Sequence, residues 1–338
     1  MRLAVVILNY NTLALLRNCL RSVFAASERH ADQLAVEVLV VDSASSDGSA
    51  AMVAAEFPAA QLIASPMNLG YTGGNNLGLR WLGFAVAAPT LPGLELPRRS
   101  PPDFVLLLNA DTEVVGDALW TMANILIQHP EAGACGARLT YGDGAFQHGA
   151  FRFPSLTQLA ADLFPLDTVP GVRRIWPRFY NGPLNGRYPP TAWQGSRPFA
   201  VDFVLGAALM IRAPAIEAVG GLDNDYFMYC EEMDWCLRLA RAGWRVLAAP
   251  AAEIIHHEGQ SSRQVRWSAY ERLWRSRIRF YQKHAWRYPR GYLWLVRTML
   301  RAAMRWRACL AERRFARGLV SGTDVAAELK SYAQIARL

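Results

Sequence analysis

The sequence predicts an α/β fold with a parallel sheet, and three observations support this prediction. Residues 3–8, 36–41 and 103–108 are continuous apolar runs, as expected of strands buried on both faces. Segments with helical spacing of apolar residues separate these runs, so strands and helices alternate along the chain. With 338 residues, of which 52% are hydrophobic and 19% charged, the chain can bury a large core. The crossovers between parallel strands are expected to be right-handed.

The other elements follow from the same spacing rules and from turn residues. Helices are expected where apolar residues recur every three to four positions, over residues 12–26, 49–56 and 230–242. A short strand is expected at residues 61–64, another strand at residues 203–212, and a last strand within residues 245–255. Glycine and asparagine dominate residues 70–78, which predicts a loop that leads into a helix ending near Val86. Surface excursions are expected at the proline-containing stretches over residues 87–102 and 151–200.

Polar side chains stand directly after three of the predicted strands. Asn9 follows the first strand, Asp42 the second, and Asp111 the strand over residues 103–108. The carboxyl ends of parallel strands meet at one edge of a sheet, and ligands bind at that edge in such folds. These residues therefore predict a binding site at this edge.

Asp111 is the strongest single candidate for a metal ligand. A carboxylate at a strand end can bind a hard divalent cation, although Asp111 can also begin a turn as a cap. The residue two positions earlier is Asn109, so the segment carries one carboxylate where a DxD motif has two. His256 and His257 follow the last predicted strand, and either imidazole can complete the metal site. His256 is favoured, with His257 as the alternative.

Three acidic residues, Glu231, Glu232 and Asp234, lie within four positions of a predicted helix. Neighbouring carboxylates raise one another's proton affinity, which suits a general base. A solvated helix start would also favour acids through the helix dipole. Aromatic and apolar residues on both sides of the cluster argue against a purely solvated surface.

The predicted loop beginning at Asn68 is a candidate phosphate site. Its glycines, among them Gly70 and Gly73, and Asn75 can bring backbone N–H groups close to a phosphate. The pattern alone is weak, because it is neither a GxGxxG motif nor a P-loop.

Six ordered segments resemble family 2 glycosyltransferases, and in particular the rhamnosyltransferase-like branch. They are VVILNYN (5–11), VVDSASSDGS (40–49), NLGYTGGNN (68–76), LLLNADT (106–112), the stretch over residues 201–246 and HHEGQSS (256–262). The resemblance implies a GT-A fold, in which a Rossmann-like nucleotide-binding sheet is fused to an acceptor-binding half. Residues 1–262 would form this catalytic domain, and residues 263–338 a basic, mostly helical C-terminal region.

The resemblance also implies roles for individual residues. Asp42 would contact the nucleobase, and Asn9, Tyr10 and Asn11 would line the nucleotide. The loop carrying Asn68, Gly70, Gly73 and Asn75 would support the ribose and diphosphate. The DxD-like segment Asn109–Ala110–Asp111 would line the donor, with Asp111 and His256 holding a divalent metal, Mg²⁺ or Mn²⁺. Three positions depart from the usual family pattern: Ser43 for Asn, Asn109 for the first acid of DxD, and Glu231–Glu232 for a Glu-Asp pair.

The implied reaction is a single displacement with inversion of configuration. Glu232, in the pair with Glu231, would remove the proton from an acceptor hydroxyl, and Asp234 is the alternative base. The branch favours dTDP-rhamnose as donor, with a UDP-hexose as the alternative. The acceptor would be a glycan or lipid-linked saccharide in cell-surface polysaccharide synthesis.

The net charge of +8 is concentrated toward the C-terminus, where arginines alternate with aromatic residues from Arg263 onward. This composition fits an anionic membrane surface, a nucleic acid, or a helical subdomain that packs on the catalytic core or forms a homodimer. Five scattered cysteines predict a reducing compartment. Without a recognisable signal peptide or spanning segment, the expected location is the cytoplasm, with peripheral contact at the inner face of the plasma membrane.

Three other classes compete with the transferase. A nucleotidyltransferase would need a phosphate loop with glycine and lysine near the N-terminus, and residues 8–18 contain neither. A nucleic-acid-binding protein would leave the acid cluster at Glu231 unexplained, so no nucleic-acid partner is expected. A non-catalytic homologue would not be expected to keep Asp42, Asp111, Glu232 and His256 together.

Overall fold

The computed structural model describes residues 1–164, 171–172, 182, 185–257 and 266–338. The described residues form two compact units. Unit 1 contains Met1–Arg152, Pro190–Phe227 and the residues from Glu231 to His257; unit 2 contains the described parts of Phe153–Pro189, Met228–Cys230 and residues 266–338. The boundary predicted between residues 262 and 263 lies outside the described residues, as do Arg263 and the last part of the HHEGQSS segment.

Unit 1 is built on a mixed sheet with the strand order β3-β2-β1-β4-β11-β6-β12-β5. These strands are β1 (Arg2–Asn9), β2 (Ala35–Ser43), β3 (Gln61–Ser65), β4 (Phe104–Asn109), β5 (Thr112–Val114), β6 (Ala132–Thr140), β11 (Ala208–Arg212) and β12 (Arg245–His256). Strands β1 to β4 run parallel, as predicted. Strand β11 runs antiparallel to β4 and β6, so the sheet as a whole is mixed. An apolar run indicates burial, and it does not specify strand direction.

The single strand predicted over residues 203–212 is in fact two strands. β10 (Phe203–Val204) pairs with β8 (Ala150–Phe151) in a separate two-stranded sheet, whereas β11 lies in the main sheet. The chain leaves strand geometry between them, where the Tyr71 hydroxyl donates to the carbonyl of Gly206 at 2.6 Å. The main sheet is extended by β7 (Phe146–Gln147) and β9 (Phe199–Val201), with the short helix η4 (Pro190–Trp193) before β9.

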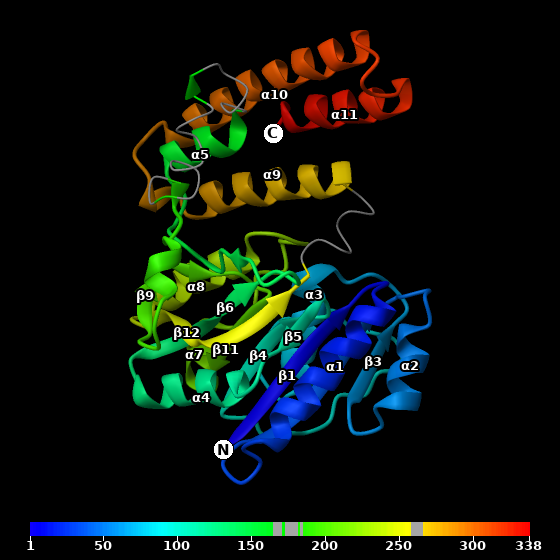
Figure 1. The fold of residues 1–338 in the computed structure, drawn as a ribbon, viewed down its shortest axis with the longest axis vertical. Helices are drawn as coiled ribbons and strands as arrows, with labels where there is room; N and C mark the ends of the chain where they lie inside the picture. Colours follow the sequence, from blue (N-terminus) through cyan, green and yellow to red (C-terminus); the bar gives the residue numbers. More distant parts are fainter. Residues whose placement is uncertain (165–170, 173–181, 183–184, 258–265) are drawn as a thin grey trace. The chain divides into compact units, whose positions relative to one another are not determined.

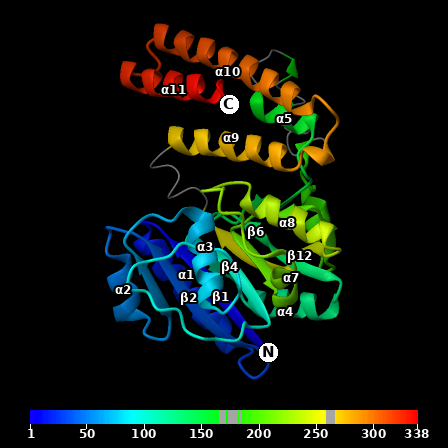
Figure 2. The ribbon, with the colours of Figure 1, turned by 180° about the vertical axis from the view of Figure 1, so that it is seen from behind.

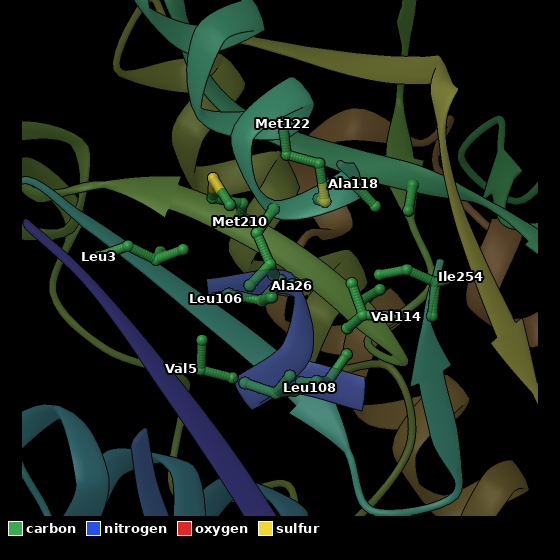
Figure 3. Packing of buried hydrophobic residues seen from close by; sticks show 14 of the residues in the cluster. Leu3, Val5, Ala26, Leu106, Leu108, Val114, Ala118, Met122, Met210 and Ile254 are labelled. Atoms are coloured by element: carbon green, nitrogen blue, oxygen red, sulfur yellow. The ribbon is translucent and has the colours of Figure 1, made fainter. Parts of the chain in front are cut away.

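Helices cover both faces of the main sheet (Figures 1 and 2). Those of unit 1 are α1 (Leu13–Glu28), α2 (Ser49–Glu56), α3 (Gly70–Trp81), α4 (Ala118–Gln128), α7 (Ala213–Val219) and α8 (Glu231–Arg241). Leu3, Val5 and Ile7 of β1 belong to the core on the face covered by α1 and α4. Figure 3 shows Leu3 and Val5 in this core, with Met122 of α4. Both faces of β1 are buried, which explains its continuous apolar run.

The glycine-rich loop predicted over residues 70–78 is instead the first part of helix α3. Its glycines allow the helix to approach the sheet closely. A Cβ at Gly78 would lie 2.6 Å from Cγ1 of Val6, and a Cβ at Gly74 would collide with Leu8. The prediction of a loop was therefore wrong because these glycines serve packing, and the cost of glycine in a helix is small beside a clash with the sheet.

Unit 2 is helical in its described part, as predicted for residues after about 263. Its helices are α5 (Leu156–Leu163), α9 (Arg266–Lys283), η6 (Ala285–Arg287), α10 (Tyr292–Ala316) and α11 (Gly322–Ile335). Trp274 and Phe280 of α9 are buried within it. Arg277 of α9 forms an ion pair of 2.7 Å with Asp162 of α5, and Arg307 of α10 donates to the carbonyl of that same Asp162. Among the residues described, no helix has both the length and the apolar character needed to cross a bilayer.

Candidate active site

The three strand ends singled out by the sequence lie side by side in unit 1. Asn9 at the end of β1 is in register with Asp42 on β2, and Leu8 is in register with Asn109 on β4. The prediction that these segments share one sheet edge is therefore confirmed, because the register of parallel strands fixes their ends together.

Asn9 and Asp42 form a buried network at this edge. The Asn9 amide donates to Oδ1 of Asp42 at 2.7 Å and to Oγ of Ser45 at 3.0 Å. The other carboxylate oxygen of Asp42 accepts the N–H of Ser45. Asn11 has a positive φ of 51° and accepts the N–H of Ser46 on its side-chain oxygen. The loop after β2 is thus held against the loop after β1.

Two further residues shape this edge differently. Tyr10 is exposed at this edge. Asp47 accepts the N–H of Leu13 at the start of α1 and the hydroxyl of Ser49 at the start of α2. Burial tends to raise the pKa of Asp47, but these hydrogen bonds outweigh it and lower the pKa below its ordinary value. A charged Asp47 therefore joins the beginnings of two helices.

The start of α3 offers fewer phosphate donors than the sequence indicated. The N–H of Gly70 donates to Oδ1 of Asn68 at 2.9 Å, and the N–H of Tyr71 donates to the carbonyl of Phe227 at 2.8 Å. Asn75 donates its side-chain amide to the carbonyl of Tyr71, within the helix. Gly73 lies in the helix with Pro89 against it. The role of this segment toward the donor's diphosphate stays a prediction.

Asp111 and His256 face each other, as the metal-site prediction requires. Oδ1 of Asp111 lies 3.4 Å from Nε2 of His256, and the Asn109 amide nitrogen lies 3.5 Å from the same Nε2. The other ring nitrogen of His256 lies 3.0 Å from Oε1 of the buried Gln147. A proton on Nδ1, donated to Gln147, leaves Nε2 with a lone pair facing Asp111.

His257 points to a different carboxylate. Its Nε2 lies 2.8 Å from Oε1 of Glu113, while its N–H donates to the carbonyl of Asp111. The geometry therefore favours His256 over His257 as the partner of Asp111. Within the residues that the structure describes, no cluster of three or more His, Cys, Asp or Glu side chains could hold a metal ion.

The acid pair Glu231–Glu232 begins helix α8, and its two side chains differ in burial. Glu231 is buried, and Glu232 is partly buried. One carboxylate oxygen of each is inaccessible and accepts no hydrogen bond from the described residues. Burial raises the pKa of Glu232 to about 7. Burial, and then the charge of Glu232, raise the pKa of Glu231 well above its ordinary value.

The carboxylate of Asp234, the alternative base, forms an ion pair with Arg238. Its Oδ2 accepts from Nε of Arg238 at 2.8 Å, and the side chain is fully buried. Arg238 also donates to the carbonyls of Val219 and Gly221. A carboxylate neutralised in this way holds α8 to the segment before it, and the geometry favours Glu232 as the base.

Tyr71 links the acid pair to the end of β4. The charges of Glu231 and Glu232, after burial, raise the pKa of Tyr71, so its hydroxyl lies within their electrostatic reach. That hydroxyl donates to the carbonyl of Gly206, and the next carbonyl, of Ala207, accepts the N–H of Asn109 at 3.0 Å. Two hydrogen bonds thus connect Tyr71, which feels the charges of the acid pair, to the DxD-like segment within unit 1.

Sequence reasoning missed Ser45, Gln147, Tyr71 and Arg238 as parts of this site. Ser45, Tyr71 and Arg238 lie inside the segments that resemble the family, so the sequence marked their segments but gave these residues no role. Gln147 lies outside all six segments, and its significance depends on the partner that the fold brings to it.

A mixed sheet whose first strands run parallel, with a carboxylate–imidazole pair at its edge and an acid pair at the start of α8, is the arrangement expected of a glycosyltransferase of the GT-A type. The chain belongs to the glycosyltransferase-like family 2, whose family model matches residues 1–279. The N-acetylglucosaminyl-diphospho-decaprenol L-rhamnosyltransferase of Mycobacterium tuberculosis is 30% identical over 242 residues, which cover 71% of this chain and 72% of that protein. The rhamnosyltransferase WbbL of Escherichia coli is 41% identical over 86 residues, 23% of this chain and 33% of that protein.

Solved structures support the same fold. A mannosyltransferase from Pyrobaculum calidifontis, in complex with GDP-Man and Mn²⁺, superposes with a TM-score of 0.54 at 17% identity and covers 99% of this chain and 85% of that one. GalNAc-T7 with UDP, GalNAc and Mn²⁺ gives a TM-score of 0.50 at 12% identity, over 76% of this chain and 44% of that one. The expected GT-A fold with a helical C-terminal region is confirmed. The family makes sugar transfer the chemistry of this chain, and the nucleic-acid-binding alternative receives no support.

Proposed function

We propose that this protein transfers rhamnose from dTDP-rhamnose, with inversion, to a hydroxyl of a lipid-linked saccharide in cell-surface polysaccharide synthesis. The rhamnosyltransferase relatives support the sugar, and the name of the mycobacterial relative supports a diphospho-lipid acceptor. A UDP-hexose donor and a soluble glycan acceptor are the alternatives. The observation that carries the proposal is Glu232, a partly buried carboxylate whose pKa is raised to about 7.

Glu232 acts as the general base in this mechanism. It takes the proton of the acceptor hydroxyl while the oxygen attacks the anomeric carbon, and the bond from that carbon to the diphosphate oxygen breaks. Attack and departure occur on opposite faces, so the configuration inverts without a covalent sugar–enzyme intermediate. A base with a pKa near the operating pH is half available and still basic enough to accept the proton.

In this proposal the strand-end residues hold the donor. Asp42, which hydrogen-bonds to Asn9 and Ser45, contacts the nucleobase, and Tyr10 and Asn11 line the nucleotide. Asp111 and His256 would hold a divalent ion, Mn²⁺ or Mg²⁺, that neutralises charge developing on the leaving diphosphate. The residues fit such an ion: one carboxylate oxygen and one imidazole nitrogen face each other at 3.4 Å, which leaves the remaining coordination positions to phosphate oxygens. Both GT-A neighbours were solved with Mn²⁺.

Substitution of Glu232 tests the proposed base. Glu232→Gln removes the proton acceptor and keeps the side-chain size, so sugar transfer should fall by ~10²–10⁴-fold. Binding of dTDP with Mn²⁺, followed by calorimetry, should change little. Glu217→Gln, at an exposed glutamate of α7, is the matched control and should transfer normally. Turnover of Glu232→Gln at the unsubstituted rate would refute the base assignment.

A panel of nucleotide sugars tests the donor. Each is added with Mn²⁺ and the shift in melting temperature is measured, since a ligand stabilises the folded state by RT ln(1 + [L]/Kd). dTDP-rhamnose should give the largest shift and the fastest release of nucleotide diphosphate. A larger shift and faster turnover with a UDP-hexose would instead establish the alternative donor.

A further inference from the structure

The charge of this chain is divided sharply along the sequence. Residues 266–338 contain seventeen arginines and lysines and only four acidic residues, a formal excess of thirteen positive charges. Because the whole chain carries +8, the residues before Arg266 sum to a net negative charge. Unit 2 therefore carries a cationic field of its own, which no step of sugar transfer requires.

Helix α9, whose sequence indicated an interfacial helix, directs its large aromatic residues inward. Trp274 is 1% exposed and Phe280 is fully buried. Its Arg277 is committed to the ion pair with Asp162. The part of α9 that the sequence singled out is thus largely core of unit 2, and it cannot present these aromatic rings to a membrane without unfolding.

Exposed aromatic residues lie instead on η6 and α10. Trp286 is 56% exposed and Trp294 is 70% exposed. On α10 the exposed positions Trp294, Arg301 and Arg305 recur after seven and four residues, so they share one helix face. Val296, Leu300 and Met304 are buried on the other side. Arg290, also exposed, precedes the helix. We use the name tryptophan–arginine surface for these exposed residues of η6, α10 and the turn between them: Trp286, Arg290, Trp294, Arg301 and Arg305.

We propose that the tryptophan–arginine surface docks this protein on an anionic lipid bilayer. Indole rings prefer the boundary between headgroups and acyl chains, and arginines are attracted to anionic headgroups. A second copy of the chain is a poorer occupant, since it would bring arginines of the same surface together. The proposal rests on the proposed function in one respect, namely that a lipid-linked acceptor places the reaction at such a bilayer.

Vesicle binding of the full chain tests the surface. The probes are vesicles of phosphatidylcholine alone and vesicles that also contain phosphatidylglycerol, followed by co-sedimentation. Trp286→Ser with Trp294→Ser removes the aromatic part, and Arg290→Ala with Arg305→Ala removes two exposed charges. Each double variant should bind the anionic vesicles roughly tenfold or more weakly. The control pair in unit 1, Arg21→Ala with Ile127→Ala, should bind like the unsubstituted protein.

Three outcomes would overturn the proposal. Both double variants could bind anionic vesicles unchanged; the unsubstituted protein could bind duplex DNA and ignore the vesicles; or the tryptophan variant could dissociate a dimer, seen by light scattering, without affecting vesicle binding. Donor-induced stabilisation and transfer to a water-soluble acceptor should survive in all variants. Vesicle binding without any nucleotide-sugar turnover would refute the proposed function and leave the docking surface standing.

Discussion

At the residue scale, the reaction should depend on the protonation of two neighbouring glutamates. Glu232 must be ionised to act as a base, and burial raises its pKa to about 7. Transfer should therefore rise as the pH increases from 6 to 8, by up to about tenfold per pH unit below the pKa. The rate constant measured at saturating donor across this range checks the prediction. A flat profile with chemistry rate-limiting would show that another group, or none, accepts the proton.

Glu231 should make the folded state less stable as the pH rises. Burial and the charge of Glu232 raise its folded pKa, so between the unfolded and folded pKa values the folded state binds more protons than the unfolded state. Stability therefore falls with increasing pH in that window. Glu231→Gln cannot titrate and should lose this part of the dependence. The difference in the free energy of unfolding between the variant and the unsubstituted protein, measured by urea denaturation from pH 5 to 8, should grow in favour of the variant; a constant difference would contradict this.

The sequence predicted those site residues whose position depends on a strand end. Asn9, Asp42 and Asp111 follow apolar runs, and parallel pairing brings such ends together whatever the loops between them do. It did not predict Gln147 as the partner of His256, because 109 positions separate them. Nor did it predict that Asp234 is paired with Arg238, since an i,i+4 spacing permits an ion pair without requiring one.

At the element scale, helix α3 should tolerate no residue larger than glycine at Gly78, where it packs against β1. A Cβ at Gly78 would lie 2.6 Å from Cγ1 of Val6, a β-branched residue that has few other rotamers. Gly78→Ala should lower the free energy of unfolding by about 1–3 kcal/mol, even though alanine is the better helix former. Urea denaturation measures the change.

Gly322 in the first turn of α11 provides the matched control. A Cβ there would meet only ordinary contacts, the nearest at 3.7 Å from the ring of Phe315. Gly322→Ala should leave the stability unchanged or raise it slightly. If both alanine variants behaved alike, the close approach of α3 to β1 would not be the reason for its glycines.

The same helix shows where element prediction failed. Glycine and asparagine individually favour loops, and nothing else in the pattern over residues 70–78 indicated a helix. The contacts of Gly74 and Gly78 with β1 overrode that preference.

Strands β5 and β6 and helices α4 and α7 were not anticipated, whereas α2, over residues 49–56, was predicted to the residue. The difference lies in turn signals: Asp47 and Gly48 mark the start of α2, whereas α7 follows Arg212, and Pro214 in its first turn is a start signal that was overlooked.

At the scale of the whole molecule, composition predicted that the C-terminal part is basic. It did not predict which side chains of that part are exposed. The alternation of arginine and aromatic residues from Arg263 onward fitted both an interfacial helix and a packed subdomain. In the structure α9 supplies much of the core of unit 2, and the exposed tryptophan of these two helices, Trp294, lies on α10. Helical spacing alone could not decide this, because α9 and α10 both combine cationic and apolar positions.

The excess of positive charge in unit 2 predicts how salt should affect sugar transfer to a lipid-linked acceptor. Attraction between unit 2 and an anionic bilayer is screened over a Debye length of about 8–10 Å near physiological ionic strength, whereas donor contacts inside unit 1 are far less screened. Raising the salt concentration should therefore increase the KM for a lipid-linked acceptor in anionic vesicles several-fold. The KM for the nucleotide sugar, and transfer to a water-soluble acceptor, should change little. Steady-state kinetics with both acceptors at matched salt concentrations separate the two effects. If both acceptors lost activity in parallel, salt would be acting on the donor site, and the cationic helices would have no part in acceptor capture.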